Sequence, residues 1–190
     1  MIIGLMGYSG SGKSTFANIL KDMGAYIIDA DEIGKNLLKK GSPALKKVID
    51  LFGEEYLLSD GNLNRKKLGD KVFNSEKSLN LLNSITFLEI ERKIKNEIKK
   101  SDKPVTVVDC ALLCDMEIIN LCDEVIFFDT PYKTLLERII KRDNISEDTA
   151  KGRLKRQEKD YKKYATYILE NKEIAELKKE AYNLMKGWIK

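Results

Sequence analysis

A glycine-rich segment near the start of the chain constrains the fold more than any other feature. An apolar run over residues 2–6 precedes it, and a helical pattern over residues 13–23 follows it. The segment consists of Gly7, Tyr8, Ser9, Gly10, Ser11, Gly12, Lys13 and Ser14, which matches GxxxxGK[ST]. Glycines let successive backbone N–H groups point inward around a phosphate, and the helix N-terminus adds partial positive charge. The agreement of motif and context disfavours a chance Gly/Ser turn and predicts a site for a nucleoside triphosphate.

Individual roles follow from the chemistry of this loop. The main chain from Gly7 to Gly12, with Ser11, is predicted to hold the phosphates. Lys13 is expected to reach the β- and γ-phosphates, and the Ser14 hydroxyl to bind Mg²⁺. Thr15, one step further into the helix, can donate to a phosphate. ATP and Mg²⁺ are therefore the expected ligands.

Short apolar runs alternate with helical segments along the whole chain. The expected strands span residues 2–6, 26–29, 105–109, 124–128 and, more weakly, 167–169. Most of these runs are continuously apolar, as in strands that helices cover on both faces. Long helical segments between strands imply crossover connections and a parallel sheet. The pattern predicts an α/β P-loop nucleoside-triphosphate hydrolase fold, with a five-stranded parallel sheet flanked by helices.

The helical stretch over residues 32–100 is far longer than one crossover requires, since some 70 residues separate two strands. It predicts a helical insertion at the edge of the sheet. We expect one domain over residues 1–190, with a core formed by 1–30 and 104–190. A final helix over residues 172–189 has an apolar side that is typical of packing.

Two carboxylates, Asp29 and Asp31, lie at the C-terminal end of the second expected strand. In an extended chain, i and i+2 side chains share one side, and the carboxyl ends of parallel strands face the ligand crevice. A carboxylate there could accept the proton of an attacking hydroxyl. Alternatively, Asp31 could simply cap the following helix.

A third carboxylate, Asp109, ends the third expected strand. This is the usual position for an aspartate that holds Mg²⁺ in P-loop proteins. An aspartate at a strand end is also an ordinary start to a turn.

Two basic helical segments, joined by a short turn, follow the fourth strand. Arg138 and Arg142 are four residues apart on one face of a helix over residues 132–142, and Ser146 is expected to cap the next helix. A lid over about residues 138–160 is one interpretation, with guanidinium groups that close on the triphosphate. A solvated helical hairpin is the other.

Composition excludes several mechanisms and partners. The chain has no histidine, so a Ser-His-Asp triad, an HExxH zinc site and a histidine base are excluded. Its 34 Lys+Arg and 30 Asp+Glu leave a net charge of +4 spread over mixed signs, which predicts no nucleic-acid partner. No apolar run approaches the ~20 residues of a membrane span, and no signal peptide is evident. We expect a cytoplasmic protein without a membrane partner, a monomer or weak homo-oligomer, with its three cysteines as reduced, buried thiols.

Other P-loop classes fit less well. No Asn-Lys-x-Asp guanine motif is present, since Asn171-Lys172-Glu173-Ile174 lacks the aspartate, and no LSGGQ-like stretch occurs. The small size and the paired carboxylates indicate a small-molecule kinase.

Motifs along the chain resemble the dephospho-CoA kinase family over residues 3 to about 171. The matching segments are Gly4-Leu5-Met6-Gly7 with the glycine-rich loop, residues 25–33 (AYIIDADEI), Phe52-Gly53, residues 60–65 (DGNLNR) with Leu68 and residues 72–73, Leu82-Asn83, Leu112-Leu113 with Asp115, and Arg138, Arg142, Asp143, Arg153 and Gln157. The combination is specific, although the glycine-rich loop alone is not.

The resemblance implies transfer of the ATP γ-phosphate to the ribose 3′-hydroxyl of dephospho-CoA. Asp31 would be the general base and Arg142 the lid arginine. The insertion would bind the acceptor, with Arg65 as a candidate for its anionic groups. Asp29 and Leu112 would be further acceptor-binding residues.

The chain departs from the family pattern at several positions. Thr86-Phe87 stands where the family has His-Pro, Ala111 replaces a proline, Cys114-Asp115 replaces Phe-Glu, and Ala165-Thr166 replaces Ala-Asp. These departures concern the acceptor side and the far end of the sheet. Two alternatives stay open: another P-loop small-molecule kinase, similar to shikimate or nucleotide kinases, and a nucleotide-binding protein without turnover.

Overall fold

The chain is described by a computed structural model over residues 1–170 and 173–189. It divides into two compact units: Met1–Asp29 with Glu97–Lys190, and Ala30–Asn96. Asn171 and Lys172 lie outside the described residues. They are the first two residues of the segment that lacks the guanine motif, and Lys172 is the expected start of the last helix. Within the described part, no helix combines the length and apolar character needed to cross a membrane.

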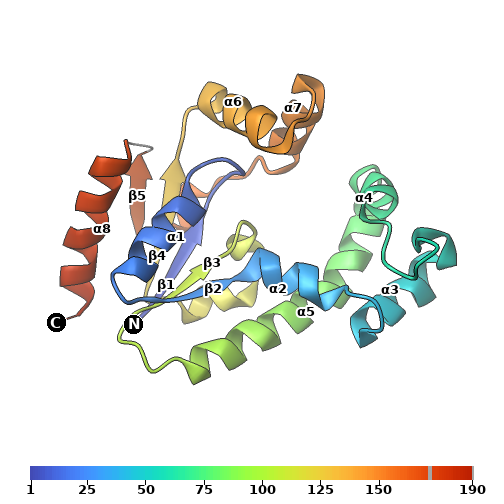
Figure 1. Cartoon of the computed structure of the whole chain (residues 1–190), viewed down its shortest axis with the longest axis horizontal. Coiled ribbons are helices and arrows are strands. Elements are labelled where there is room, and N and C mark those ends of the chain that lie inside the picture. Colours follow the sequence, from blue (N-terminus) through green and yellow to red (C-terminus); the bar gives the residue numbers. More distant parts are fainter. Residues whose placement is uncertain (171–172, 190) are drawn as a thin grey trace. The chain divides into compact units, whose positions relative to one another are not determined.

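The first unit is built on a parallel sheet (Figure 1). Its strands are β1 (Ile2–Met6), β2 (Tyr26–Asp29), β3 (Thr106–Asp109), β4 (Glu124–Asp129) and β5 (Tyr167–Glu170). They lie in the order β2-β3-β1-β4-β5, and every neighbouring pair is parallel. The predicted parallel sheet of five strands is confirmed, including the weakly marked fifth strand. The third strand begins one residue later than expected.

Helices α1 (Lys13–Asp22) and α8 (Ile174–Trp188) cover one face of this sheet (Figure 1). Phe16 of α1 meets Phe128 of β4 edge to face, with ring centroids 5.4 Å apart, and both side chains are buried. Burial of one such ring stabilises the fold by about 1.5–3 kcal/mol. On the other face, β1 approaches the short helices η2 (Leu113–Asp115) and η3 (Glu117–Leu121). A Cβ at Gly4 would clash with Cδ2 of the buried Leu113, so a larger residue there would force that side chain to move.

A helical hairpin follows β4. It consists of α6 (Tyr132–Asp143) and α7 (Glu147–Arg156), with η4 (Lys162–Tyr164) beyond it. Asn144 makes the turn in the left-handed region, at φ 50°, and the Ser146 side chain accepts from the Thr149 N–H as predicted for an N-cap. Leu135, Ile139, Ala150 and Leu154 form a small core between the helices.

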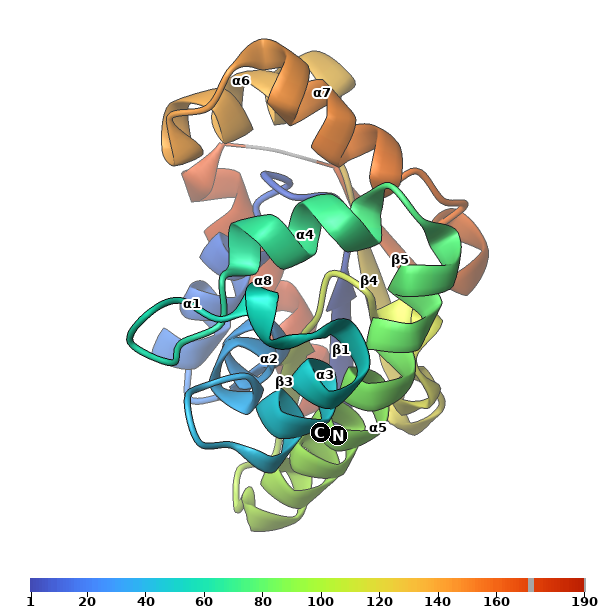
Figure 2. The same ribbon diagram turned by 90° about the vertical axis from the view of Figure 1, so that its right-hand side faces the viewer.

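The second unit is helical (Figure 2). It has its own hydrophobic core. It contains α2 (Ala30–Leu37), α3 (Pro43–Phe52), η1 (Glu54–Tyr56), α4 (Arg65–Phe73) and most of α5 (Glu76–Lys100). Ser42 caps α3 by accepting from the Leu45 N–H, Pro43 occupies the first turn, and Gly53 ends the helix at φ 108°. The helical stretch begins at residue 30, two residues earlier than predicted.

The expectation of buried thiols is right for Cys110 and only partly right for the other two cysteines. Cys114 and Cys122 are half-buried, and all three are free of disulfides. Burial raises the pKa of both, that of Cys122 to about 12. Their thiolates are therefore disfavoured.

Candidate active site

The loop between β1 and α1 has a backbone conformation suited to binding an anion. Gly7, Gly10 and Gly12 adopt φ angles of 145°, 81° and 100°, in the region that side chains disfavour. Gly12 directly precedes α1, whose first turn carries no acidic residue. The first N–H groups of this helix and its positive dipole end therefore face the loop.

Lys13 lies inside this loop. Its side chain is 8% exposed, and its ammonium donates to the carbonyl oxygens of Gly7 at 2.8 Å and Tyr8 at 3.0 Å. The Lys13 cation is thus held at the loop itself. Such a fixed ammonium suits phosphate oxygens that enter the loop.

Ser11 in the loop and Thr15 in the first turn of α1 provide further hydroxyl groups at this site. The Ser11 Oγ is buried, and among the described residues it has no hydrogen-bond partner. A buried hydroxyl without a partner costs about 1–3 kcal/mol, so a phosphate oxygen would satisfy it. Thr15 is exposed in the first turn of α1, where donation to a phosphate is open to it.

Ser14 and Asp109 meet at the carboxyl end of the sheet. The Ser14 hydroxyl donates to Asp109 Oδ2 at 2.9 Å, across 95 residues of sequence. Asp109 ends β3, where it pairs in register with Leu5 of β1 and Asp29 of β2. A hydroxyl and carboxylates at one strand edge are oxygen ligands of the kind that Mg²⁺ prefers.

No group of three or more His, Cys, Asp and Glu side chains within residues 1–170 and 173–189 could enclose a metal ion. A magnesium ion bound here would complete its shell with phosphate oxygens and water, as it commonly does. The pair Ser14 and Asp109 fits that mode.

Side chains of the hairpin reach the glycine-rich loop. Arg138 donates to the Gly10 carbonyl at 3.2 Å, and Arg142 Nη2 donates to Ser9 Oγ at 3.0 Å. Gly10 also packs closely against α6, since a Cβ there would lie 3.3 Å from the Leu135 carbonyl. Both predicted arginines therefore contact the loop expected to bind the triphosphate.

Asp143, which the sequence analysis did not select as a site residue, orients Arg142 of α6 and Arg153 of α7. Its carboxylate accepts from Arg142 Nε at 2.7 Å and Nη2 at 3.0 Å, and also from Arg153. The Arg142 guanidinium, supported by Arg153, lowers the pKa of Asp143 to about 2. Its place directly after Arg142 is the sequence signal that could have identified it.

Replacing Asp143 with asparagine should lower the stability of the fold at neutral pH. The folded state favours the charged carboxylate, so its contribution is full above the usual pKa of 3.8 and is lost as pH falls toward about 2. We expect a loss of about 1–2 kcal/mol at neutral pH, allowing for partial solvent exposure. Denaturant unfolding at about pH 7 and about pH 3 checks this. The difference between the two proteins should shrink at the lower pH, and a constant difference would contradict the assignment.

Gln157 is a second residue of the site to which the sequence analysis gave no role. Its Oε1 accepts from the Ser9 N–H at 2.8 Å, across 148 residues of sequence. The contact joins the end of α7 to the glycine-rich loop. The matching lid motif contained Gln157, but no local pattern indicates its partner.

The structure corrects the argument that placed Asp29 and Asp31 together. Asp29 ends β2, but α2 begins at Ala30, so Asp31 lies in the first turn of a helix. The i,i+2 argument requires an extended chain and is wrong here, because helical residues two apart do not share a face. Nor does Asp31 precede the helix as an N-cap; it belongs to it. Both carboxylates are exposed.

Arg65 and Leu112 belong to different units. Arg65 begins α4 and donates from Nη2 to the Lys35 carbonyl at 2.8 Å, one helical turn after Asp31 on α2. The second unit therefore brings Arg65 and α2 together. Leu112 is exposed in the loop after β3, in the first unit.

The residues that depart from the family pattern have local roles. The Thr86 hydroxyl donates to the Leu82 carbonyl within α5. Thr166 Oγ1 accepts from the Val125 N–H at 2.8 Å and so joins β5 to β4. Asp115 pairs with Lys159.

A parallel five-stranded sheet with this glycine-rich loop after its central strand, and a basic hairpin against the loop, defines a P-loop kinase. The family model described as dephospho-CoA kinase matches residues 1–176, and the chain belongs to this family.

Individual relatives agree over nearly the full length. The dephospho-CoA kinase of Carboxydothermus hydrogenoformans is 36% identical over 193 residues, which covers 98% of this chain and 94% of that protein. The solved structure of dephospho-CoA kinase from Campylobacter jejuni superimposes with a TM-score of 0.69 at 28% identity, covering 97% and 95% of the two chains. TT1252 from Thermus thermophilus shares the fold, with a TM-score of 0.88 at 24% identity over 100% and 98% of the chains.

Proposed function

We propose that this chain transfers the γ-phosphate of ATP to the ribose 3′-hydroxyl of dephospho-CoA, which yields CoA in the last step of its biosynthesis. The observation that carries the proposal is the glycine-rich loop of this member of the dephospho-CoA kinase family. It brings together the Lys13 ammonium, the Ser11 hydroxyl, which has no hydrogen-bond partner among the described residues, and the Ser14–Asp109 pair. These groups are the ones that a bound triphosphate requires.

The residues divide the work of phosphoryl transfer. Loop N–H groups, Lys13 and Thr15 hold the phosphates, and Arg138 and Arg142 of a lid over about residues 138–160 neutralise charge that develops during transfer. The Asp31 carboxylate accepts the proton of the 3′-hydroxyl while the 3′ oxygen of the acceptor forms a bond to the γ-phosphorus. The bond between phosphorus and the β–γ bridging oxygen breaks, and ADP leaves with those electrons.

Mg²⁺ would be held by Ser14 directly and by Asp109 through water. When bound, it neutralises phosphate charge and orients the triphosphate. The Ser14–Asp109 hydrogen bond keeps the hydroxyl and the carboxylate together at one edge of the sheet.

Replacing Asp109 with asparagine should raise the Mg²⁺ concentration required for half-maximal activity roughly tenfold, because one carboxylate charge is lost beside the ion. A magnesium titration of the initial rate measures this. Asp102→Asn, an exposed position before β3, is the matched control and should leave the titration unchanged. An unchanged titration for Asp109→Asn would remove Asp109 from the proposed site.

The acceptor side is proposed to involve the insertion over about residues 32–100. Arg65 would bind anionic groups of dephospho-CoA, with Asp29 and Leu112 as further contacts. Arg65 is already oriented through its hydrogen bond to the Lys35 carbonyl, which supports a binding role over a freely solvated one.

The proposed setting is the cytoplasm, with ATP and dephospho-CoA as small-molecule partners and a monomer or weak homo-oligomer as the active form. Three thiols without disulfides are compatible with a reducing compartment.

An acceptor panel tests the proposal. ADP release is measured with dephospho-CoA, shikimate and a set of nucleosides and nucleotides, each with Mg²⁺ and ATP. We expect turnover with dephospho-CoA alone. Turnover with a different acceptor would replace the assigned substrate, and ATP binding without turnover of any acceptor would contradict the enzymatic assignment.

A further inference from the structure

We propose that Gln157 and Tyr161 are positioning residues of the phosphate loop, with Tyr161 acting through Gln157. Gln157 fixes the Ser9 N–H through its carboxamide, and Tyr161 fixes the main chain of Gln157. The inference rests on the proposed function in taking ATP as the nucleotide that this loop binds.

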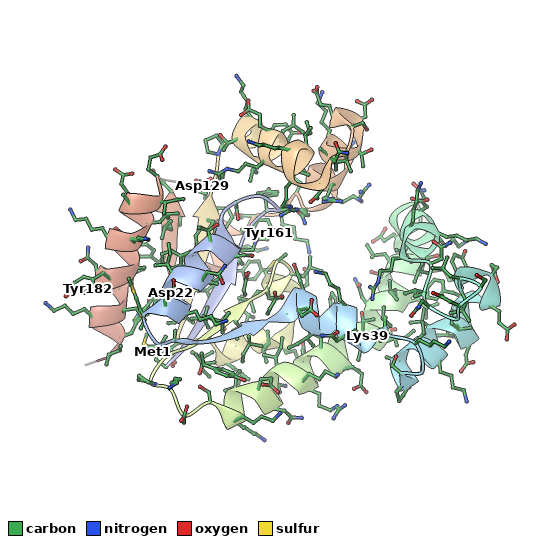
Figure 3. The ribbon with its side chains drawn as sticks, in the orientation of Figure 1. Met1, Asp22, Lys39, Asp129, Tyr161 and Tyr182 are labelled. Atoms are coloured by element: carbon green, nitrogen blue, oxygen red, sulfur yellow. The ribbon has the colours of Figure 1, made fainter. Side chains whose placement is uncertain are left out.

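Tyr161 is a buried anchor (labelled in Figure 3). Its side chain is 2% exposed, and its ring stacks on Phe127 of β4 with centroids 5.4 Å apart. It also meets the ring of Tyr8 edge to face at 5.1 Å. Its hydroxyl donates to the Gln157 carbonyl at 2.9 Å. The phenol therefore links the sheet, the glycine-rich loop and the end of α7.

Gln157 presents its side chain to the loop from this fixed backbone. It follows the last residue of α7 as the C-cap, and its Oε1 accepts from the Ser9 N–H. The preceding carbonyl, that of Tyr8, accepts from the Lys13 ammonium at 3.0 Å and from the Ser11 N–H at 3.2 Å. The Tyr8–Ser9 peptide is thus held on its N–H side by Gln157 and on its carbonyl side by Lys13 and Ser11.

Two ion pairs hold the segment after α7 on the sheet. Lys159 pairs with Asp115, beyond β3, and Lys162 pairs with Asp129 at the end of β4, at 2.7 Å. Exposed ion pairs contribute little energy, so they serve to locate the segment, and the buried Tyr161 ring holds it. Gln157 therefore lies directly before a segment that is anchored to the sheet.

This arrangement matters because phosphate binding depends on a loop whose N–H groups are already oriented. Loss of the Gln157 contact leaves the Tyr8–Ser9 peptide held on its carbonyl side alone, so the peptide gains conformational freedom that ATP binding must then remove. The free energy needed to reorder the loop weakens ATP binding equally in the ground state and in the transition state. The change therefore appears in the KM for ATP rather than in kcat.

A double-mutant cycle tests the proposal with Gln157→Ala, Tyr161→Phe and the double variant. Tyr161→Phe keeps both ring contacts and removes only the hydroxyl, and Gln157 is half-exposed, so neither change opens a core cavity. Tyr164→Phe, an exposed tyrosine in η4, is the matched control. The dissociation constant for Mg²⁺-ATP is measured by calorimetry without acceptor, with kcat, KM for ATP and Tm measured beside it.

We expect Gln157→Ala to weaken ATP binding about tenfold and Tyr161→Phe several-fold, with kcat nearly constant. Because Tyr161 acts through Gln157, the double variant should bind ATP as Gln157→Ala does. Unchanged ATP binding in Gln157→Ala, or fully additive losses in the double variant, would overturn the proposal. A purely structural role would lower Tm without changing the dissociation constant, which also overturns it.

The two proposals fail separately. ATP binding without acceptor reports on the loop, whereas turnover of dephospho-CoA by the unmodified protein reports on the proposed function. Absent turnover together with non-additive loss of ATP binding would remove the proposed function and leave this inference standing.

Discussion

Replacing Asp31 with asparagine should lower kcat by about 10²–10⁴-fold and leave the affinity for ATP nearly unchanged. The amide has almost the shape of the carboxylate but cannot accept the proton of the acceptor hydroxyl. Asp31 lies in the first turn of α2, in the second unit, whereas the glycine-rich loop lies in the first. Asp31 is not among the residues proposed above to hold the nucleotide.

The control is Glu32→Gln, the same change one residue later in the same helical turn. Glu32 is exposed and pairs within α2 with Lys35 and Asn36, so its replacement should leave kcat within about twofold. Steady-state kinetics for dephospho-CoA, with ATP binding measured independently, separate the two effects. An unchanged kcat in Asp31→Asn would remove Asp31 as the base.

Replacing Lys13 with alanine should damage both nucleotide binding and rate. A charged hydrogen bond to phosphate contributes about 1.5–3 kcal/mol, which corresponds to a roughly 10- to 150-fold loss of ATP affinity. We expect kcat to fall by a further 10²-fold or so, because the same ammonium neutralises charge that grows during transfer.

Two controls make the Lys13 result specific. Lys21→Ala removes an exposed lysine from the last turn of the same helix and should change neither quantity. Lys13→Met keeps the buried aliphatic stem and should reproduce the alanine result, which excludes a packing effect. Normal ATP binding in both Lys13 variants would contradict the assigned role of the loop.

The glycine-rich loop and the sheet could be predicted because their signals are local. Three glycines at fixed spacing, a buried strand and a helix start all lie within residues 2–23, and the structure reproduces each of them. Continuous apolar runs likewise indicated the parallel strands, including β5. These features depend on backbone conformation and burial, which sequence pattern records.

The geometry around Asp31 could not be predicted in the same way. The second strand was expected to end at Asp29 and the chain to stay extended through Asp31, but α2 starts at Ala30 without an intervening loop. Asp31 and Glu32 lie in the first turn of α2, where negative charge stabilises the helix N-terminus. This local preference favours a helix over an extended chain at Asp31.

Long-range side-chain contacts were also beyond the sequence. Gln157 meets Ser9 across 148 residues, and Thr166 meets Val125 across 41. Such pairs depend on how strands and helices pack, which no spacing within one segment encodes. The sequence shows that Asp143 follows Arg142. It does not show that the Asp143 carboxylate accepts hydrogen bonds from both Arg142 and Arg153, because this contact depends on the folded hairpin.

The most direct measurement of the central claim is ³¹P NMR of the product formed from ATP and dephospho-CoA. The account predicts that ADP and a new phosphomonoester appear in equal amounts, with the phosphorus coupled to the proton on the ribose 3′ carbon. A phosphate on any other position, or inorganic phosphate released without transfer, would contradict it.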